Sequence, residues 1–389
     1  MNAFTYFTPT RVVFGQDAER QTGALVRAQG ARKVLLHFGG QSAQRSGLLD
    51  RIRASLDDAG IAHVELGGVV PNPRLSLVYQ GIDLAKREAV DFVLAVGGGS
   101  VIDSAKAIGY GAANEGDVWD FYAGKRKAAA CLPVGVVLTI AASGSEMSNG
   151  SVITKDEGGV KRFYDDDLAR PRFAVMNPDL TLSLPAYQTA SGCVDILMHT
   201  MERYFNHGDN MELTDRISES LMRTVIQNAH ILTVRPQDAR ARAEVMWAGS
   251  LSHNGLTGCG TDGGDFASHK LEHELGGMFD VAHGAGLAAI WGSWARYVVD
   301  ARPERFAQFA EQVFGLTGGS VQELALAGIA AMEDFYRSIG MPTSLRELGI
   351  SPTDEQIAEM ARQCASDGAI GIVKKLNADD MIAIYRSAR

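Results

Sequence analysis

Residues 269–287 read His-Lys-Leu-Glu-His-Glu-Leu-Gly-Gly-Met-Phe-Asp-Val-Ala-His-Gly-Ala-Gly-Leu, and they hold three of the nine histidines of this 389-residue chain. The pattern predicts a helix with His269 and His273 on one face, because side chains four positions apart lie above one another. We expect the glycine pair 276–277 to end that helix and a short loop to lead to His283. A second, apolar helix should start there, and its two early glycines would leave room for close backbone approach.

Two imidazoles on a helix and a third on the following loop can converge on one point, which is a metal-site geometry, but this segment supplies no carboxylate to that point. Asp195 and His199 are four residues apart on an earlier segment and would supply one. One carboxylate and three imidazoles suit a divalent transition metal such as iron(II) or zinc, with a net positive charge left on the site. Histidine pairs at this spacing also arise by chance in ordinary helices, and spacing alone does not select among the histidines.

Length and composition predict a globular protein with two domains. A chain of 389 residues exceeds one core, and 46% hydrophobic and 21% charged residues are ordinary for soluble proteins. A net charge of −9 without a basic cluster argues against nucleic acid and anionic membranes as partners. The first residues lack a signal-peptide pattern, and the most apolar window, 128–142, is too short to cross a bilayer. Four separated cysteines without a Cys-x-x-Cys motif indicate free thiols, so we expect a cytoplasmic protein.

The first half of the chain alternates between short apolar runs and helical patterns. This alternation predicts an α/β domain whose parallel sheet is covered by helices on both faces. The predicted strands are 11–15, 33–38, 63–66, 92–96 and 134–139, and the predicted helices are 18–29, 47–59 and 75–88, with another opening after residue 97.

The second half reads as helical throughout. Three prolines between residues 171 and 185 indicate a linker, and apolar residues then recur at helical spacing. We therefore predict a dinucleotide-binding α/β domain at 1–184 and an all-helical, metal-binding and catalytic domain at 185–389.

Gly97-Gly98-Gly99-Ser100 follows a predicted strand and opens a predicted helix. The glycines would let the backbone approach a ligand, Ser100 could cap the helix, and its free amides would attract phosphate. Glycines are also common in ordinary strand–helix turns, so both interpretations stay open. Asp103, one turn further on, would point away from a phosphate and could hold a loop or a nicotinamide amide. The Gly-x-Gly-x-x-Gly fingerprint of the standard Rossmann fold is absent after every predicted strand.

Gly39-Gly40-Gln41-Ser42 follows an earlier predicted strand, where dinucleotide-binding folds commonly place an acid against the ribose. The missing acid would remove repulsion of a 2′-phosphate, and Gln41 and Ser42 could donate hydrogen bonds to it. The alternative is that the glycines only allow a tight turn. Residues 139–146 begin at the end of another predicted strand and contain three hydroxyl side chains and a glycine. This composition suits either a polar turn or a loop that covers the cofactor.

Together these motifs resemble the iron-containing (group III) alcohol dehydrogenases. The likeness is carried by 97–106 (Gly-Gly-Gly-Ser-Val-Ile-Asp-Ser-Ala-Lys), 144–146 (Gly-Ser-Glu) and the spacing His-x3-His-x9-His-Gly from residue 269. It extends from the N-terminal strand to about residue 315. Segments 116–121, 194–199 and 246–249 are most similar to the NADPH-dependent butanol dehydrogenase and aldehyde reductase branch.

The resemblance implies a dehydroquinate synthase-like fold and a specific ligand set. Asp195, His199, His269 and His283 would bind the metal and form the catalytic centre with His273. His273 matches the family's non-ligand histidine near the nicotinamide, and we expect it to move the proton.

The resemblance also implies a cofactor site. The expected cofactor-binding residues are Gly39, Gly40, Ser42, Asn72, Gly97, Gly98, Gly99, Ser100, Asp103, Thr139 and Lys161. Family members that use NAD tend to have an aspartate where Gly40 aligns, so the resemblance implies NADP(H). The chain departs from the family at 139–146, where Thr-Ile-Ala-Ala-Ser-Gly-Ser-Glu replaces Thr-Thr-Ala-Gly-Thr-Gly-Ser-Glu and removes a hydroxyl and a glycine.

The predicted function is a metal-dependent NADP(H) alcohol dehydrogenase or aldehyde reductase. It would transfer hydride between the nicotinamide and a small aliphatic alcohol or aldehyde, and we expect a homodimer. One alternative is a lyase related to dehydroquinate synthase, but such a site needs several basic side chains, and 254–283 offers one lysine, Lys270. The other is a non-catalytic nucleotide-binding protein with a structural metal, which the complete ligand set and the extra histidine disfavour.

Overall fold

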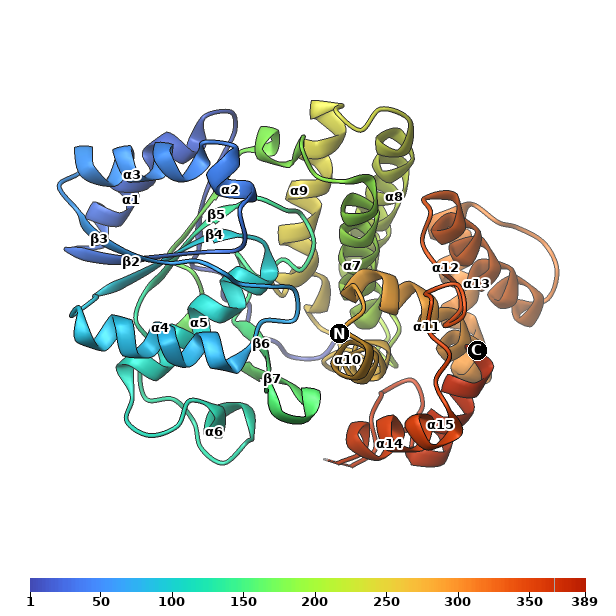
Figure 1. Cartoon of the computed structure of the whole chain (residues 1–389). Coiled ribbons are helices and arrows are strands. Elements are labelled where there is room, and N and C mark those ends of the chain that lie inside the picture. Colours follow the sequence, from blue (N-terminus) through green and yellow to red (C-terminus); the bar gives the residue numbers. More distant parts are fainter. Residues whose placement is uncertain (367) are drawn as a thin grey trace. The chain divides into compact units, whose positions relative to one another are not determined.

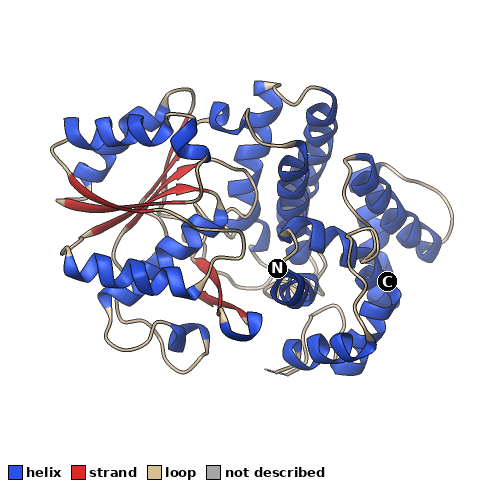
Figure 2. Cartoon of the chain, in the orientation of Figure 1, coloured by secondary structure: helices blue, strands red, loops and turns tan. Residues whose placement is uncertain are grey.

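The computed structural model describes residues 1–366 and 368–389 and divides them into two compact units. One unit is Phe7–Ser183, and the other is Leu184–Arg389 together with Met1–Tyr6. All the named strands among the described residues fall in the first unit, and the second is helical (Figure 1, Figure 2). The predicted fold class is therefore confirmed. The border at residues 184 and 185 between a cofactor-binding and a catalytic domain stays a prediction.

The α/β unit is built on a six-stranded sheet in the order β1-β8-β5-β4-β2-β3, and every neighbouring pair is parallel. The central strands β4 and β5 are buried along their whole length, as expected for strands covered on both faces. The strands are β1 (Arg11–Phe14), β2 (Lys33–Phe38), β3 (Ala62–Leu66), β4 (Phe92–Gly97), β5 (Val134–Leu138) and β8 (Phe173–Met176).

Helices cover both faces of this sheet (Figure 1). Val34 and Leu36 of β2 pack in one buried cluster with Leu49 and Ile52 of α3, whereas Leu35 between them points to the opposite face. The helices of one face are α1 (Thr22–Ala28) and α3 (Leu48–Asp58), and those of the other are α4 (Leu75–Arg87) and α5 (Gly99–Ala113). Two short helices, α2 (Ser42–Arg45) and α6 (Trp119–Tyr122), lie in connections, as do the 3-10 helices η1 (Ala18–Gln21), η2 (Glu157–Gly159), η3 (Asp167–Ala169) and η4 (Pro178–Thr181).

The linker prediction is wrong where β8 lies, because this buried strand sits between β1 and β5 in the sheet. Pro171 and Pro178 flank the strand without interrupting it, so the chain loses no ladder hydrogen bond. The sequence pattern also missed the antiparallel hairpin of β6 (Gly150–Thr154) and β7 (Lys161–Asp165).

The second unit consists of helices around an aromatic core. Trp291, Trp294, Phe205, Phe306 and Phe309 are almost fully buried and contact one another. The helices are α7 (Ala186–Tyr204), α8 (Glu212–Val234), α9 (Ala239–His253), η5 (Leu256–Gly258), α10 (Ala267–Phe279), α11 (His283–Val298), η6 (Val299–Ala301), α12 (Pro303–Phe314), α13 (Val321–Ser338), α14 (Asp354–Cys364) and α15 (Ala378–Ser387). Among the described helices, none is both long and apolar enough to cross a bilayer.

The predicted end of α10 at the glycine pair is wrong. The helix continues to Phe279 and ends at Asp280, which has a left-handed backbone (φ 53°) and donates its N–H to the carbonyl of Gly276. An internal glycine costs a helix only about 1 kcal/mol, which tertiary packing readily offsets.

The predicted close approach at the start of α11 is confirmed. A Cβ on Gly284 would lie 2.0 Å from the backbone oxygen of Ser191 on α7, and one on Gly286 would lie 2.9 Å from Cγ of Glu272 on α10. These two glycines therefore bring α11 against both helices that carry the candidate metal ligands.

Candidate metal centre

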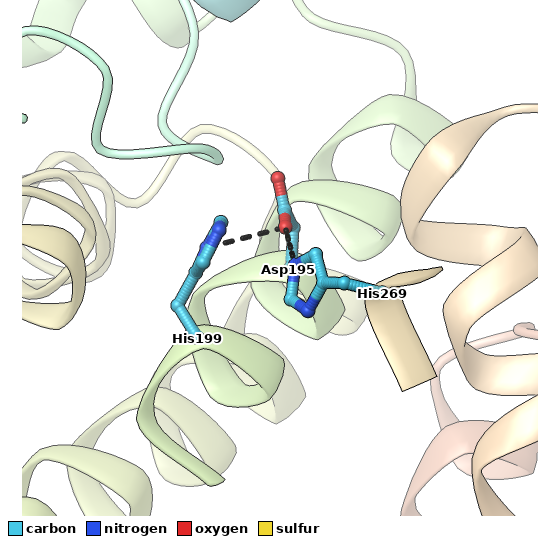
Figure 3. Close-up of side chains that lie close together, drawn as sticks. All are labelled: Asp195, His199 and His269. Carbon is cyan, nitrogen blue, oxygen red and sulfur yellow. Dashed lines mark ion pairs between the residues drawn. The ribbon is translucent and has the colours of Figure 1, made fainter. Parts of the chain in front are cut away.

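Asp195 and His199 on α7 and His269 on α10 form a compact, buried group (Figure 3). One candidate ligand atom from each residue lies within 4.8 Å of the others. Oδ1 of Asp195 is 3.3 Å from Nδ1 of His199 and 3.7 Å from Nε2 of His269. The helical spacing of Asp195 and His199 thus places both side chains where α10 presents His269.

These atoms fit a divalent cation. Asp195 Oδ1, His199 Nδ1 and His269 Nε2 are buried and have no hydrogen-bond partner within the described residues. Three buried polar atoms that lack a hydrogen-bond partner are costly to bury, and a cation bound between them would offset that cost. Imidazole nitrogen and carboxylate oxygen are ligands of iron and zinc alike, so the donor set is that of a transition-metal site.

His283, the fourth predicted ligand, begins α11 at the edge of this group. Its Nε2 is 3.7 Å from Oδ1 of Asp195, similar to the distance for His269. Its side chain is 29% exposed, whereas those of the other three residues are at most 8% exposed. Its role as a ligand stays a prediction, and its position would close the group on the more open side.

His273 lies beside the group and is not one of the three clustered residues. Its ring centroid is 6.5 Å from that of His269 and 5.9 Å from that of His283. It is half-buried. A histidine that carries a proton must lie near the candidate metal centre without being a ligand, and the position of His273 is compatible with this. The role of His273 stays a prediction.

The protein surroundings shift two of the histidine pKa values in opposite directions. Burial, together with the nearby His253 and His269 rings, holds the pKa of His199 well below its usual range. Burial also acts to lower the pKa of His269, but the carboxylates of Asp195 and Glu202 outweigh it and raise that pKa to about 9. His269 therefore lies in the more negative part of the cluster.

Sequence reasoning missed several residues that contact the candidate ligands. Glu202 accepts from the ring of His269, and Glu272 accepts from that of His283. The guanidinium of Arg203 donates to the backbone oxygen of His199 at 2.7 Å. The ring of His253 lies 4.0 Å from that of His199, centroid to centroid. The spacing from Asp195 to Glu202, seven residues on a helix that also carries His199, could have revealed Glu202.

The predicted cofactor residues of the α/β unit gather at the carboxyl ends of neighbouring strands. Gly39 and Gly40 follow β2, and Thr139 follows β5. The glycine run, Gly97 to Gly99, begins at the last residue of β4 and ends at the first residue of α5. Thr139 donates its N–H to the carbonyl of Gly97 at 3.1 Å. A Cβ on Gly39 would lie 3.6 Å from Val101 in the first turn of α5. In open α/β sheets this edge is where ligands bind.

The glycine run has a packing role of its own. A Cβ on Gly98 would lie 2.0 Å from Cγ2 of Ile140, and one on Gly99 would lie 2.3 Å from Oγ of Ser143. Gly98 occupies the N-cap position of α5, so the prediction that Ser100 caps this helix is wrong. Phosphate binding at the glycine run stays a prediction.

Asp103 holds a loop, as its position suggested. Its carboxylate accepts from Oγ of Ser145 at 2.6 Å and from the backbone N–H of Val152 at 2.9 Å. Burial raises the pKa of Asp103. A contact of Asp103 with the cofactor stays a prediction.

Lys106, one turn after Asp103, completes this attachment and was missed in the sequence. Its Nζ donates to the carbonyls of Ser145, Ser148 and Gly150 at 2.8, 3.0 and 2.8 Å. Lys106 is fully buried, and burial lowers its pKa to about 8. Residues 145–150 are thus fixed to α5.

Asn72 and Lys161 are both buried near the β6–β7 hairpin. Asn72 has a left-handed backbone (φ 55°), and the carbonyl of the adjacent Pro73 accepts from the N–H of Thr154 at 2.9 Å. Thr154 in turn pairs with Lys161. The structure therefore brings these two predicted cofactor residues to one region, and their contacts with the cofactor stay predictions. Ser42 begins α2 and is exposed.

Two family models match this chain. Residues 9–178 match the model described as "Iron-containing alcohol dehydrogenase", and residues 189–389 match "Fe-containing alcohol dehydrogenase family, C-terminal".

Individual relatives cover the chain from end to end. The probable NADH-dependent butanol dehydrogenase 1 of Bacillus subtilis is 38% identical, with 100% of each chain covered. The NADPH-dependent aldehyde reductase YqhD of Escherichia coli is 34% identical, also with 100% of each chain covered. Among solved structures, NADH-dependent butanol dehydrogenase A of Thermotoga maritima is 36% identical, covers 100% of this chain and 99% of its own, and superimposes with a TM-score of 0.96.

Proposed function

This chain belongs to the iron-containing alcohol dehydrogenase family, and from that premise we propose that it interconverts small aliphatic aldehydes and alcohols with NADP(H). Its activity class is that of a metal-dependent oxidoreductase acting on alcohols or aldehydes with a nicotinamide cofactor. The observation that carries the proposal is the buried group of Asp195, His199 and His269, which lies in the segment matched by the C-terminal family model.

The metal would be held by Asp195, His199 and His269, with His283 as the fourth ligand. When bound, a divalent metal supplies a Lewis acid that polarises the substrate oxygen. The burial of the first three side chains excludes water from that side of the centre, which strengthens electrostatic interactions there. The more exposed His283 marks the side from which substrate oxygen would approach.

His273 would carry the proton of the reaction. During alcohol oxidation its ring nitrogen would accept the proton of the substrate hydroxyl, and during aldehyde reduction it would return one. Its distance from the rings of His269 and His283 places it next to the centre without belonging to the cluster. Its partial exposure leaves a route for proton exchange with solvent.

Small aliphatic substrates are supported by the names of the relatives. They include butanol dehydrogenases from Bacillus subtilis and Clostridium acetobutylicum, and 1,3-propanediol dehydrogenase from Klebsiella pneumoniae at 31% identity. The shared chemistry of these names is a short primary alcohol.

The preference for NADP(H) is supported by the turn after β2. Gly40 is exposed, and among the described residues no heavy atom outside its two chain neighbours lies within 4 Å of the position of a Cβ on it. The turn therefore leaves open space where a carboxylate would repel a 2′-phosphate. Gln41, Ser42 and Arg45 are exposed nearby and could donate hydrogen bonds to phosphate.

NAD(H) is the second candidate, favoured by the names of several relatives. Butanol dehydrogenases of 35–38% identity are described as NADH-dependent, whereas the aldehyde reductase of 34% identity is NADPH-dependent. The ratio of kcat/KM for NADP⁺ and NAD⁺ separates the two candidates: a ratio above one supports the NADP(H) proposal, and a ratio below one refutes it.

We also propose a cytoplasmic homodimer. Among the described residues the four cysteines form no disulfide, which agrees with a reducing compartment. Light scattering behind a sizing column measures the mass in solution, and a mass equal to one chain would refute the dimer.

The deciding experiment is oxidation of butanol with NADP⁺ before and after chelation. We expect activity to disappear with the chelator and to return with added Fe²⁺ or Zn²⁺. A lyase related to dehydroquinate synthase would not reduce the cofactor with butanol. A non-catalytic binding protein with a structural metal would bind the cofactor without turnover.

A further inference from the structure

We propose that Glu202 and Glu272 are positioning residues of the metal centre, each locking one histidine in the orientation that binds the metal. This inference rests on the proposed metal site and adds two residues that the ligand set does not include. Both carboxylates are almost fully buried, at 2% and 0% exposure. Neither belongs to the cluster of candidate ligand atoms around Asp195.

Glu202 connects α7 to the histidine of α10. Its Oε1 lies 3.1 Å from Nδ1 of His269 and accepts the backbone N–H of the same residue at 3.0 Å. His269 lies in the first turn of α10, where backbone N–H groups lack a partner within the helix. One carboxylate therefore fixes both the main chain and the ring of His269.

Glu272 repeats this arrangement one helix further on. It lies on α10, and its Oε2 contacts Nδ1 of His283 at the start of α11. Gly286 makes the contact possible, because a Cβ there would lie 2.9 Å from Cγ of Glu272 and 3.1 Å from its Oε1. In both cases a carboxylate on one helix contacts a histidine of another helix: α7 contacts α10 through Glu202, and α10 contacts α11 through Glu272.

The chemistry of the two contacts determines the state of each ring. A carboxylate only accepts hydrogen bonds, so Nδ1 of each histidine must carry the hydrogen. In a neutral ring Nε2 is then the bare nitrogen. Nε2 of His269 and of His283 both lie 3.7 Å from Oδ1 of Asp195. The ring nitrogen that can bind a cation is thus the one directed at Asp195. The carboxylate that accepts from the other nitrogen also raises the basicity of the ring.

The two carboxylates also change the charge of the centre. A divalent cation with Asp195 and neutral imidazoles would leave one positive charge. Two additional buried carboxylates outweigh that charge, and the ring of each histidine lies between its carboxylate and Asp195. A buried excess of negative charge favours retention of a cation and strengthens its binding.

The test compares Zn²⁺ affinity in wild-type protein, Glu202→Gln and Glu272→Gln, measured by competition with a chelator. Glutamine preserves shape and size, and we expect each variant to bind Zn²⁺ about 10–100-fold more weakly. Glu219→Gln is the matched control. Glu219 is a buried carboxylate of the same unit that accepts from the hydroxyl of Tyr204 at 2.8 Å, and its substitution should leave Zn²⁺ affinity unchanged.

A second measurement covers the case in which a variant does not fold. Proton NMR of the Co²⁺-loaded wild-type protein should show slowly exchanging, hyperfine-shifted ring N–H signals from His269 and His283, alongside the ring N–H signal of His199. Where the variants fold, Glu202→Gln should shift the signal of His269 and Glu272→Gln that of His283. Unchanged Zn²⁺ affinity in both variants, or rapid exchange of both ring protons in the wild type, would overturn the proposal. A wild-type protein that binds no Zn²⁺ would instead refute the metal site itself.

Discussion

Acidification should destabilise the α/β unit through His37, a buried residue of β2 that lies just before the turn at Gly39 and Gly40. Its ring contacts the carbonyl of Leu66 at 2.8 Å and Oγ of Ser104 on α5 at 2.9 Å. It is fully buried, and burial lowers its pKa from 6.5 to about 4. The unfolded chain therefore takes up the proton at a higher pH than the folded chain does.

The sign and size of the effect follow from this difference. Above pH 6.5 the ring is neutral in both states, and its contribution to stability is fully present. As the pH falls from 6.5 toward 4, only the unfolded state becomes protonated, and the free energy of unfolding decreases by roughly 3 kcal/mol in total. Below about pH 4 the folded state is protonated too, and the loss from this residue levels off.

Amide hydrogen exchange of peptides from β2 and β4, read by mass spectrometry, reports on this unit alone. Wild-type protein and His37→Gln are compared at each pH, so that the intrinsic pH dependence of exchange cancels. The stability difference between them should shrink by roughly 3 kcal/mol between pH 7.5 and pH 4. A difference between wild type and His37→Gln that does not change with pH would refute this reasoning.

Four further substitutions test the sites. His283→Ala should lose most of its bound metal by elemental analysis while keeping its helical circular dichroism, and wild-type stoichiometry with full activity would refute His283 as a ligand. His273→Ala should keep its metal and lower kcat by about 10²–10⁴-fold, the usual contribution of general acid–base catalysis; loss of metal would instead make His273 a ligand. Gly40→Asp should change the ratio of kcat/KM for NADP⁺ to kcat/KM for NAD⁺ in favour of NAD⁺, by a factor that corresponds to roughly 1–3 kcal/mol. The open space at this position makes the variant structurally tolerable. An unchanged ratio would therefore contradict the proposal that the turn after β2 sets the cofactor preference. Lys106→Met removes the donor for three buried carbonyls and should lower the free energy of unfolding in urea titration by about 3 kcal/mol or more, at about 1–3 kcal/mol for each unsatisfied carbonyl. A loss below about 1 kcal/mol would show that these bonds contribute little net stability.

Periodic patterns allowed much of the fold to be predicted. The apolar runs that became β2, β4 and β5 are buried on both faces, so their sequence is almost uninterrupted by polar residues. β8 is equally apolar but only four residues long, and the prolines outside its ends concealed it. The glycine pair inside α10 favours a helix end by local propensity, which takes no account of the tertiary packing that continues the helix to Phe279.

The candidate site was predictable where its residues recur on one helix face. Asp195 and His199 share α7, and His269 lies within a distinctive histidine pattern. Glu202 and Glu272 were missed because each acts on a histidine of another helix, and such contacts depend on how the helices pack. His253 approaches His199 from α9 in the same way.

The central claim is that Asp195, His199 and His269 form the metal centre on which turnover depends. The most direct test titrates chelator-treated protein with Fe²⁺ or Zn²⁺ while the rate of cofactor reduction by butanol is followed. We predict that the rate rises in proportion to bound metal until one ion per chain is reached, and that Asp195→Asn neither binds the ion tightly nor gains activity. Full turnover by the metal-free chain, or wild-type metal binding and activity in Asp195→Asn, would contradict the claim.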